Sequence, residues 1–403
     1  MTEGPLLILL VGSNPLPSYL SACAQRPSRV ALVYTEETKD AKDRLRRELA
    51  RALGEGVTFD EPFVSDATCA TTVRRVLDSL VPSDGDRDVL LSYTGGTKVM
   101  AAHARLAFSS RGRPEHASYL DEGDIKREAR LRFDDGNSKP LSDYSEPPPL
   151  TLATVLALHG ITHKPREART PAPTTGDARE ILCKVLADLP LAAALYRERE
   201  RLQEISNPNK ATSEPFRADR YGLRLSLPEL PTSEQLSQFQ NADEKKSWFR
   251  QWYASIGGEW LEEWLGAQIR ALDLAPAPEI TVGVNARWER AKKEDPPMEI
   301  DLAVIRGHRS YFISCTTDAS KDLCKSKLFE IAVRSRQLGG DLARAALVCL
   351  ADDRTASALQ RDVDDVWGAS NTTKVFGISD VRAWSDCEGK QPNRHPLKAW
   401  LES

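Results

Sequence analysis

Apolar and polar positions alternate in blocks from residue 6 to residue 133. Each aliphatic run is followed by a polar turn and then by a stretch in which apolar residues recur at helical spacing. The runs are 6–11, 30–34, 57–64 and 89–93, and the helical stretches are 37–53, 73–80 and 100–108. Runs at 117–120 and 128–133 have the pattern of a closing hairpin. This alternation predicts βαβ units, and therefore a parallel sheet with helices on both faces.

The pattern changes twice further along the chain. Pro147-Pro148-Pro149 indicates a boundary, after which we expect helices at 150–159 and 178–205 and a loop at 162–175. From Trp248 a tryptophan-rich helical region, interrupted by Gly257-Gly258, leads into an αβββαβ order. Its strands are expected at 280–284, 300–305, 311–315 and 345–350, and its long helix at 320–338. We therefore predict an α/β protein with domains at 1–145 and 248–403, joined by a helical linker at 146–247.

Composition limits where a functional site can lie. The chain has 403 residues, of which 40% are hydrophobic and 28% charged, as in ordinary globular proteins. The net charge of −4 gives no overall basic field, so any phosphate site must be local. The seven cysteines form no CxxC pair, and no signal peptide is evident. We expect a soluble protein of a reducing cytoplasm, with free thiols and no membrane span.

Two polar turns follow predicted parallel strands. Gly12-Ser13-Asn14 follows the first strand, and Thr94-Gly95-Gly96-Thr97-Lys98 follows the fourth and opens a helix. The glycines let a ligand approach the backbone, and the helix presents N–H groups to an anion. Thr94 and Thr97 add hydroxyls and Lys98 adds a charge. The second turn is therefore suited to binding a phosphate. The same segment also fits a plain strand-to-helix turn with a solvated lysine.

The segments "VGSNPLP", "VYTEET" and "SYTGGTK", which follow the first, second and fourth strands, together resemble the CARF domain of CRISPR-associated effectors. The resemblance covers roughly residues 6–133. It implies a Rossmann-like domain that dimerises and binds a cyclic oligoadenylate, with cyclic tetra-adenylate expected. By this resemblance, Ser13 and Asn14 contact a ribose or base. The phosphates would lie on the fourth-strand turn, formed by Thr94, Gly95, Gly96, Thr97 and Lys98.

The C-terminal part resembles the restriction-endonuclease-like PD-(D/E)xK domain found with CARF in ring-nucleotide-activated nucleases. The resemblance implies a metal-dependent endonuclease, with Mg²⁺ or Mn²⁺ held by carboxylates and a DNA or RNA substrate. In "MEIDLAVIRGHRSYFISC" the matching aspartate is Asp301, with Glu299 as its companion. Alternation of side chains places Asp301 on the side opposite Ile300 and Leu302.

The helix "GGEWLEEWL" contains three glutamates that could join Asp301. At about 100° per residue, Glu262 falls beside the apolar face, whereas Glu259 and Glu263 fall on the opposite side. A carboxylate beside a buried face is costly and needs a reason. We therefore predict Glu262 as a metal ligand, while an ordinary rim glutamate remains the alternative.

The third part of the nuclease pattern is missing. Where the family has a glutamate and a lysine on the strand after Asp301, this chain has Ser314 and Thr316. Serine is a poor metal ligand, and threonine carries no positive charge. The family's usual active site is therefore incomplete.

Two explanations stay open. In the first, the function of the missing lysine is taken over by Lys327 on the next helix. We predict that Lys327 lies in the apolar stripe of that helix, which consists of Leu323, Leu328, Ile331 and Leu338. Glu330 and Arg334 are expected beside Lys327, and Lys325 is expected to point away. Those neighbours also fit a simple ion-pair cluster. Alternatively, the domain is degenerate and binds nucleic acid or a partner without cutting. A nucleophilic Cys315 is disfavoured, because His308 is expected to be exposed in a hairpin turn.

Overall fold

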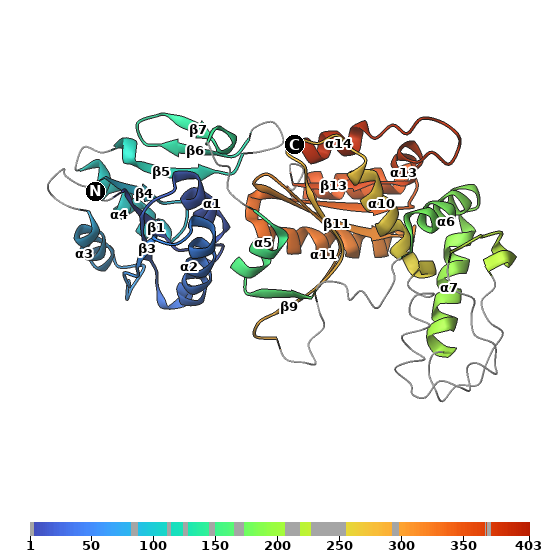
Figure 1. The fold of residues 1–403 in the computed structure, drawn as a ribbon, viewed down its shortest axis with the longest axis horizontal. Helices are drawn as coiled ribbons and strands as arrows, with labels where there is room; N and C mark the ends of the chain where they lie inside the picture. The colour runs from blue at the N-terminus through green and yellow to red at the C-terminus, as the bar shows by residue number, and fades with distance from the viewer. Residues whose placement is uncertain are drawn as a thin grey trace.

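The computed structural model describes residues 4–81, 88–110, 114–123, 128–144, 150–164, 173–205, 218–226, 255–291, 298–366, 368 and 372–403. These residues form two sheets, which lie side by side along the long axis of the molecule (Figure 1). The predicted α/β fold is confirmed. The predicted boundary at Pro147–Pro149 and the start of the last domain at residue 248 lie outside the described residues.

The first sheet is seven-stranded, in the order β3-β2-β1-β4-β5-β6-β7. Its first five strands are parallel. Strands β5 and β6 form the expected antiparallel hairpin, and β7, which the sequence pattern did not predict, pairs antiparallel with β6. The strands are β1 Leu6–Leu10, β2 Arg29–Val33, β3 Thr58–Asp60, β4 Val89–Ser92, β5 Ala117–Asp121, β6 Arg130–Phe133 and β7 Ser138–Pro140. The helices are α1 Leu16–Gln25, α2 Lys39–Leu53, α3 Ala70–Leu80 and α4 Lys98–Ser109.

Helices cover both faces of this sheet because its central strands are apolar on both sides. Along β1, Leu7 and Leu9 pack with α1 and α2, whereas Ile8 and Leu10 pack with α3 and α4. Both sets are fully buried, as a parallel sheet requires. The carboxyl ends of β1 and β4 are therefore fixed side by side at one edge of the sheet.

The second sheet is six-stranded, in the order β13-β12-β11-β10-β9-β8. Its strands are β8 Ile161–Lys164, β9 Glu279–Trp288, β10 Met298–Arg306, β11 Arg309–Thr316, β12 Ala343–Cys349 and β13 Thr373–Phe376. The expected loop from residue 162 is wrong at its start, since Thr162–Lys164 belong to β8. This strand pairs with β9, a partner more than a hundred residues away that local pattern does not reveal.

Helices also cover both faces of the second sheet. One face packs with α5 Leu152–Leu158 and α11 Lys321–Gly339. The other packs with α6 Thr175–Ala187, α7 Pro190–Ile205, α10 Trp260–Arg270, α13 Ile378–Trp384 and α14 His395–Glu402, while α12 Asp353–Arg361 packs beside β13. Helix α5 also contacts α2, so the apolar core continues from the first sheet to the second (Figure 1).

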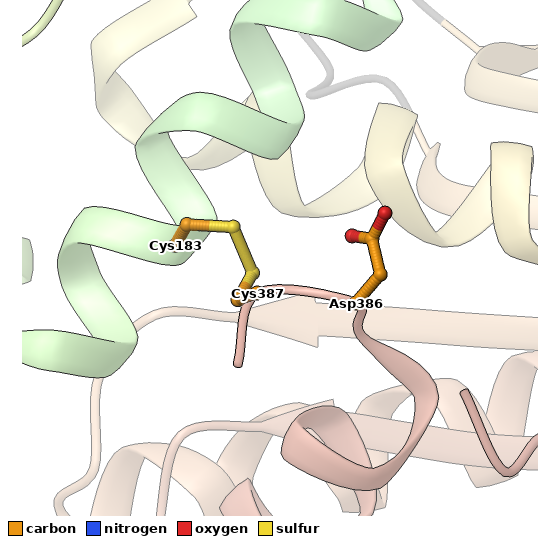
Figure 2. A group of neighbouring side chains, drawn as sticks. All are labelled: Cys183, Asp386 and Cys387. Atoms are coloured by element: carbon orange, nitrogen blue, oxygen red, sulfur yellow. A yellow bond between two sulfur atoms is a disulfide. The ribbon is translucent and has the colours of Figure 1, made fainter. Parts of the chain in front are cut away.

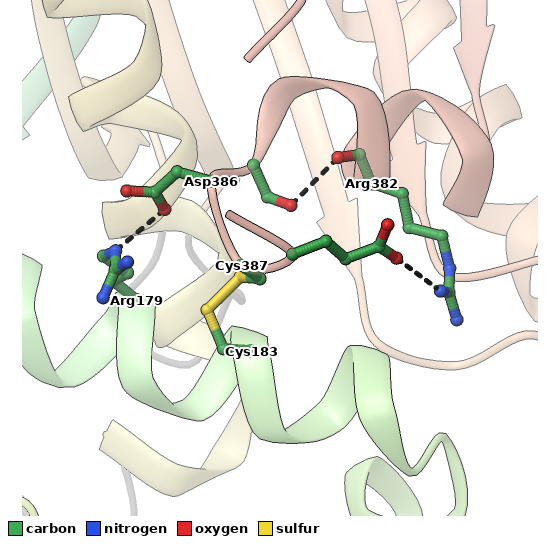
Figure 3. Close-up of a disulfide and its surroundings, with 7 residues drawn as sticks. Arg179, Cys183, Arg382, Asp386 and Cys387 are labelled. Atoms are coloured by element: carbon green, nitrogen blue, oxygen red, sulfur yellow. Dashed lines mark hydrogen bonds and ion pairs between the residues drawn. A yellow bond between two sulfur atoms is a disulfide. The ribbon is translucent and has the colours of Figure 1, made fainter. Parts of the chain in front are cut away.

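The middle of the chain is attached to the second sheet. The single helix expected at 178–205 is two helices, because Pro190 cannot continue α6 and instead starts α7. Figure 2 shows that a disulfide joins Cys183 of α6 to Cys387, which follows α13. Figure 3 shows the ion pair between Arg179 and Asp386 beside it (2.8 Å). The expectation of free thiols is therefore wrong at two of seven cysteines.

The described residues contain no helix long and apolar enough to cross a membrane.

Reduction of the disulfide is expected to lower the free energy of unfolding by about 2–4 kcal/mol, because the bond restricts the unfolded chain. It joins positions 204 residues apart. The measurement is thermal unfolding with and without dithiothreitol. The double variant Cys183→Ser/Cys387→Ser is the control, and reductant should leave its melting temperature unchanged. If all seven cysteines can be alkylated in unfolded protein that has not been reduced, the disulfide is absent and the prediction is contradicted.

Candidate functional site

The turns after β1 and β4 touch each other at the edge of the first sheet. A Cβ added at Gly95 would lie 2.1 Å from the carbonyl oxygen of Leu10, and one at Gly12 would lie 3.3 Å from the backbone nitrogen of Gly96. Gly96 has φ +75°, a conformation that favours glycine. The close backbone approach predicted for these glycines is therefore present, and only glycine fits at Gly95.

The threonines of the second turn are used within the protein. The Thr94 hydroxyl oxygen accepts a hydrogen bond from the Leu120 N–H (2.7 Å). The Thr97 hydroxyl caps α4 by accepting from the Met100 N–H (3.2 Å), and it donates to the Ala67 carbonyl (3.0 Å). These bonds fix the turn and leave Lys98 exposed at the first position of α4. Phosphate binding there stays a prediction.

Asn14 has a structural contact that the sequence did not predict. Its Oδ1 accepts from the Leu16 N–H (3.1 Å) and lies 3.3 Å from Nε2 of the buried His159. Its Nδ2 lies beside Gly340, where an added Cβ would meet it at 2.8 Å. Gly340 ends α11 and leads into β12. Ser13 stays exposed, but Asn14 joins the first turn to the second half of the protein.

Glu122 makes a second contact of this kind, just after β5. Burial, together with the Asp341 carboxylate, raises its pKa to about 7, against the lowering effect of N–H groups from Asp341 and Leu342. Its Oε2 is buried and, among the described residues, has no hydrogen-bond partner. The crevice end of the first sheet therefore rests on the corner between α11 and β12, which we call the α11–β12 corner (Gly339–Ala343).

The raised pKa of Glu122 predicts a pH dependence of stability. Between the ordinary value of 4.5 and about 7, the folded protein keeps a proton that the unfolded chain releases. The free energy of unfolding should therefore fall as pH rises through this window, by on the order of 3 kcal/mol. Glu122→Gln should flatten that slope in denaturant titrations at pH 5, 6 and 7, and the exposed Glu55→Gln should not. An unchanged slope in Glu122→Gln would contradict the assignment.

The second candidate site is a cavity of about 960 Å³. It is lined by α7, the start of α10, the ends of β10 and β11, and the first turns of α11. A smaller cavity of about 320 Å³ shares Glu299, Asp301 and Lys327 with it. Glu262 lines the larger cavity, so all three predicted catalytic residues, Glu262, Asp301 and Lys327, contribute to one space.

Asp301 lies where regular strand pairing is interrupted. The β9–β10 pairing passes over Asp301 and Gly283, which has φ +68°, and the β10–β11 pairing begins at Leu302. The prediction that Ile300 and Leu302 share one side is wrong, since they pack in the cores of opposite faces. The left-handed Gly283 breaks the pleat at this point, which lets Asp301 line both cavities.

Ser314 orients the aspartate. Its hydroxyl donates to Asp301 Oδ2 (2.9 Å), and the Cys315 N–H donates to the same oxygen (2.7 Å). Thr316 accepts from the Asp318 N–H (3.2 Å) and stabilises the turn after β11. The two residues that depart from the family pattern therefore support the site without supplying a ligand or a cation.

Glu262 is not the only glutamate of its segment in the cavity. Glu259 also lines it, so the prediction that Glu259 faces the opposite side is wrong. The reason is the π-helical turn Ser255–Glu259, in which Gly258 has φ +129°. A π-helical turn has a smaller rotation per residue than an α-helix. The direction calculated for Glu259 from α-helical geometry is therefore incorrect.

Lys327 is half-buried on α11 and lines both cavities. Glu330 and Arg334 line the smaller cavity and form an ion pair (2.5 Å), and Arg334 also donates to the Glu299 carbonyl. Lys325 pairs with Asp362 (2.8 Å), as expected for a side chain pointing away. Leu323 was predicted to be buried but is 42% exposed; its place in the stripe is taken by Cys324.

Cys315 is unsuited to nucleophilic catalysis. Burial and the charges of Asp301 and Glu262 raise the pKa of its thiol well above the usual value, against the effect of Lys327. The thiol is therefore protonated at neutral pH. His308 is in the hairpin turn as predicted, but it is partly buried, and burial together with three arginines lowers its pKa to about 4. The expectation that His308 is exposed is wrong.

The carboxylates suit a hard divalent cation. Mg²⁺ is usually held by one or two carboxylates together with water, and Mn²⁺ accepts the same oxygen ligands. Glu262 and Asp301 line one cavity, and their carboxylates are ligands of the kind that such an ion takes. In the part of the chain that the structure describes, the one compact group of three potential ligands is Cys183, Asp386 and Cys387, whose sulfurs are already bonded to each other (Figure 2).

Comparison with known proteins gives a likeness of fold. A scan against protein-family models finds no match, and a search of curated proteins finds none either. The chain is similar to Can2 from Sulfobacillus thermosulfidooxidans in complex with cyclic tetra-adenylate, with 19% identity, a TM-score of 0.62, and coverage of 92% of this chain and 95% of that one. It is also similar to protein VC1899 from Vibrio cholerae, with 15% identity, a TM-score of 0.65, and coverage of 99% and 97%. The likeness extends over both sheets and shows that this chain has the same two-part α/β fold.

Proposed function

We propose that this protein is a CRISPR ancillary effector: a homodimeric, metal-dependent nuclease activated by a cyclic oligoadenylate, with cyclic tetra-adenylate as the ring. The observation that carries the proposal is the convergence of Glu262, Asp301 and Lys327 on one cavity. The fold shared with Can2, whose structure contains cyclic tetra-adenylate, supports the choice of ligand.

The ring is assigned to the glycine turns of the first sheet. Gly12, Gly95 and Gly96 bring two backbone segments together, and Lys98 adds a cation at the start of α4. A ring with two-fold symmetry suits a symmetric dimer, in which each protomer presents the same turn to opposite phosphates. Activation requires that the ring bind the active arrangement more tightly than the inactive one.

The nuclease chemistry is assigned to the larger cavity. A divalent ion held by Glu262 and Asp301 would polarise the phosphodiester and activate water. Ser314 and the Cys315 N–H fix the Asp301 carboxylate by bonds to Oδ2, so its orientation is set before substrate binds. Lys327 supplies the positive charge that Thr316 lacks, and it stabilises negative charge that develops on the phosphate.

The activity is tested by incubating purified protein with Mg²⁺ or Mn²⁺, cyclic tetra- or hexa-adenylate, and labelled single- and double-stranded DNA and RNA. We expect cleavage only when both metal and ring are present. Asp301→Asn should reduce the cleavage rate by at least about 100-fold. Loss of a group that only supports a metal ligand already costs about 10- to 100-fold, and Asp301 is proposed to be a ligand itself. Lys327→Met should also cost about 100-fold or more. Lys325→Met is the matched control, and its rate should stay near wild type.

A nucleotide sensor that binds nucleic acid or a partner without cutting is the second candidate, favoured by Ser314 and Thr316 at the positions of the family's glutamate and lysine. Cleavage separates the two. Ring binding with no cleavage under any of these conditions would reject the nuclease and leave the sensor.

Ring binding is tested separately by calorimetry with cyclic tetra-adenylate. Lys98→Ala should weaken affinity by about 10- to 100-fold, because a hydrogen bond to a charged group contributes roughly 1.5–3 kcal/mol. Arg51→Ala, in the last turn of α2, removes a charge at the opposite edge of the sheet and should have no effect. Equal affinity in Lys98→Ala and wild type would contradict the phosphate assignment.

A further inference from the structure

Helix α7 forms part of the wall of the larger cavity and is not used by the chemistry described above. Tyr196, Arg197 and Arg199 line this cavity together with Glu262 and Asp301. The side chain of Tyr196 is 43% exposed. The wall therefore places an aromatic ring and two guanidinium groups in the same space as the carboxylates.

Arg199 is held in this wall by the glycine pair that interrupts the tryptophan-rich segment. A Cβ added at Gly257 would lie 2.3 Å from Arg199 Cδ and 2.7 Å from its Nε. The Arg199 side chain thus occupies the space that any other residue at 257 would need. This packing explains Gly257, and it brings Arg199 against the turn leading into the helix of Glu262.

Tyr196 and Arg199 also contact each other. The Arg199 guanidinium carbon lies 5.3 Å from the Tyr196 ring centroid, which is a cation–π distance. The arginine steadies the ring, whose exposed surface remains available to a planar group. Nucleobases stack on such rings in proteins that bind single strands, at roughly 1–3 kcal/mol per base.

The distribution of charge also points to a polyanion. Glu259, Glu262 and Asp301 make one side of the lining acidic, which repels nucleic acid unless cations offset it. Arg197 and Arg199 on α7, with Lys327 on α11, supply those cations. A strand that reaches the carboxylates would therefore meet the arginines of α7 on its neighbouring phosphates.

The strand must be unpaired to use this wall. A base within a duplex is already stacked and paired, and exposing it costs energy. The cavity, about 960 Å³, is the size of a small-molecule pocket and admits one strand more readily than a rigid duplex.

We propose that Tyr196, Arg197 and Arg199 form a binding wall for single-stranded nucleic acid, in which a base stacks on Tyr196 and the arginines contact flanking phosphates. This inference rests on the proposed nuclease function, because it names the substrate class and the residues that hold it.

The test is fluorescence anisotropy with labelled single-stranded DNA, single-stranded RNA and matching duplexes, with cyclic tetra-adenylate and Ca²⁺ in place of Mg²⁺. Tyr196→Ala should weaken single-strand binding by about 5- to 150-fold, and Tyr196→Phe should keep it. Arg199→Ala should weaken it about 10-fold and reduce the slope of log affinity against log salt by about 0.7. Arg361→Ala, an exposed arginine of α12 outside the cavity, is the control for charge.

Melting temperatures of all variants show whether the fold is retained, and Tyr196→Ala tests the wall independently of the packing at Gly257. Single-strand affinity unchanged in both alanine variants would overturn the inference, as would tighter binding of duplex than of single strand. Wild type that binds no nucleic acid would overturn it too. If wild type binds single strands through these residues but cuts nothing, the inference stands and the nuclease proposal fails. If wild type cuts and the variants bind and cut equally well, only the inference fails.

Discussion

The two halves of the chain meet where the loop ends of β1 and β5 rest on the α11–β12 corner. Asn14 lies against Gly340, and Glu122 lies against the N–H groups of Asp341 and Leu342. The contact adjoins a core that runs from α1 to α11. Lys327 lies about 20 Å along α11 from this corner, at 1.5 Å per residue. Helix α11 therefore runs from the corner that contacts the first crevice to Lys327 in the second candidate site.

The described residues of the segment expected to be a helical linker, 146–247, contribute to the second half of the protein. Strand β8 extends the second sheet, α5 fills the space between the two sheets, and α6 is fastened by Cys183–Cys387. Fixing α6 also positions α7, which contributes to the wall of the larger cavity. A linker in this place would leave that cavity open on the side of α7. The disulfide thus bears on the geometry of the site as well as on stability.

The sequence predicted what depends on local pattern and missed what depends on distant packing. Aliphatic runs located β1 to β6 of the first sheet but not β7, and Gly95-Gly96 correctly indicated a close backbone approach. The role of Asn14 was missed because its partners, His159 and Gly340, are remote in sequence. Helical phase placed Glu262 on the cavity but failed at Glu259, where a π-helical turn intervenes. Period-two alternation likewise failed at Asp301, opposite a left-handed glycine on another strand.

The altered segment around Ser314 has a consistent physical interpretation. Strand β11 is paired on both sides, with β10 and β12, so a cation placed there is held rigidly by two neighbours. A cation on α11 belongs to an element whose far end contacts the first half of the protein. If Lys327 replaces a lysine at position 316, the cation of the proposed site lies on the helix whose far end contacts the first half of the protein, and not in the centre of the second sheet. Ser314, on the strand itself, orients the Asp301 carboxylate through its hydrogen bond. The proposed ring site and the proposed nuclease site would then be joined by a single helix, α11.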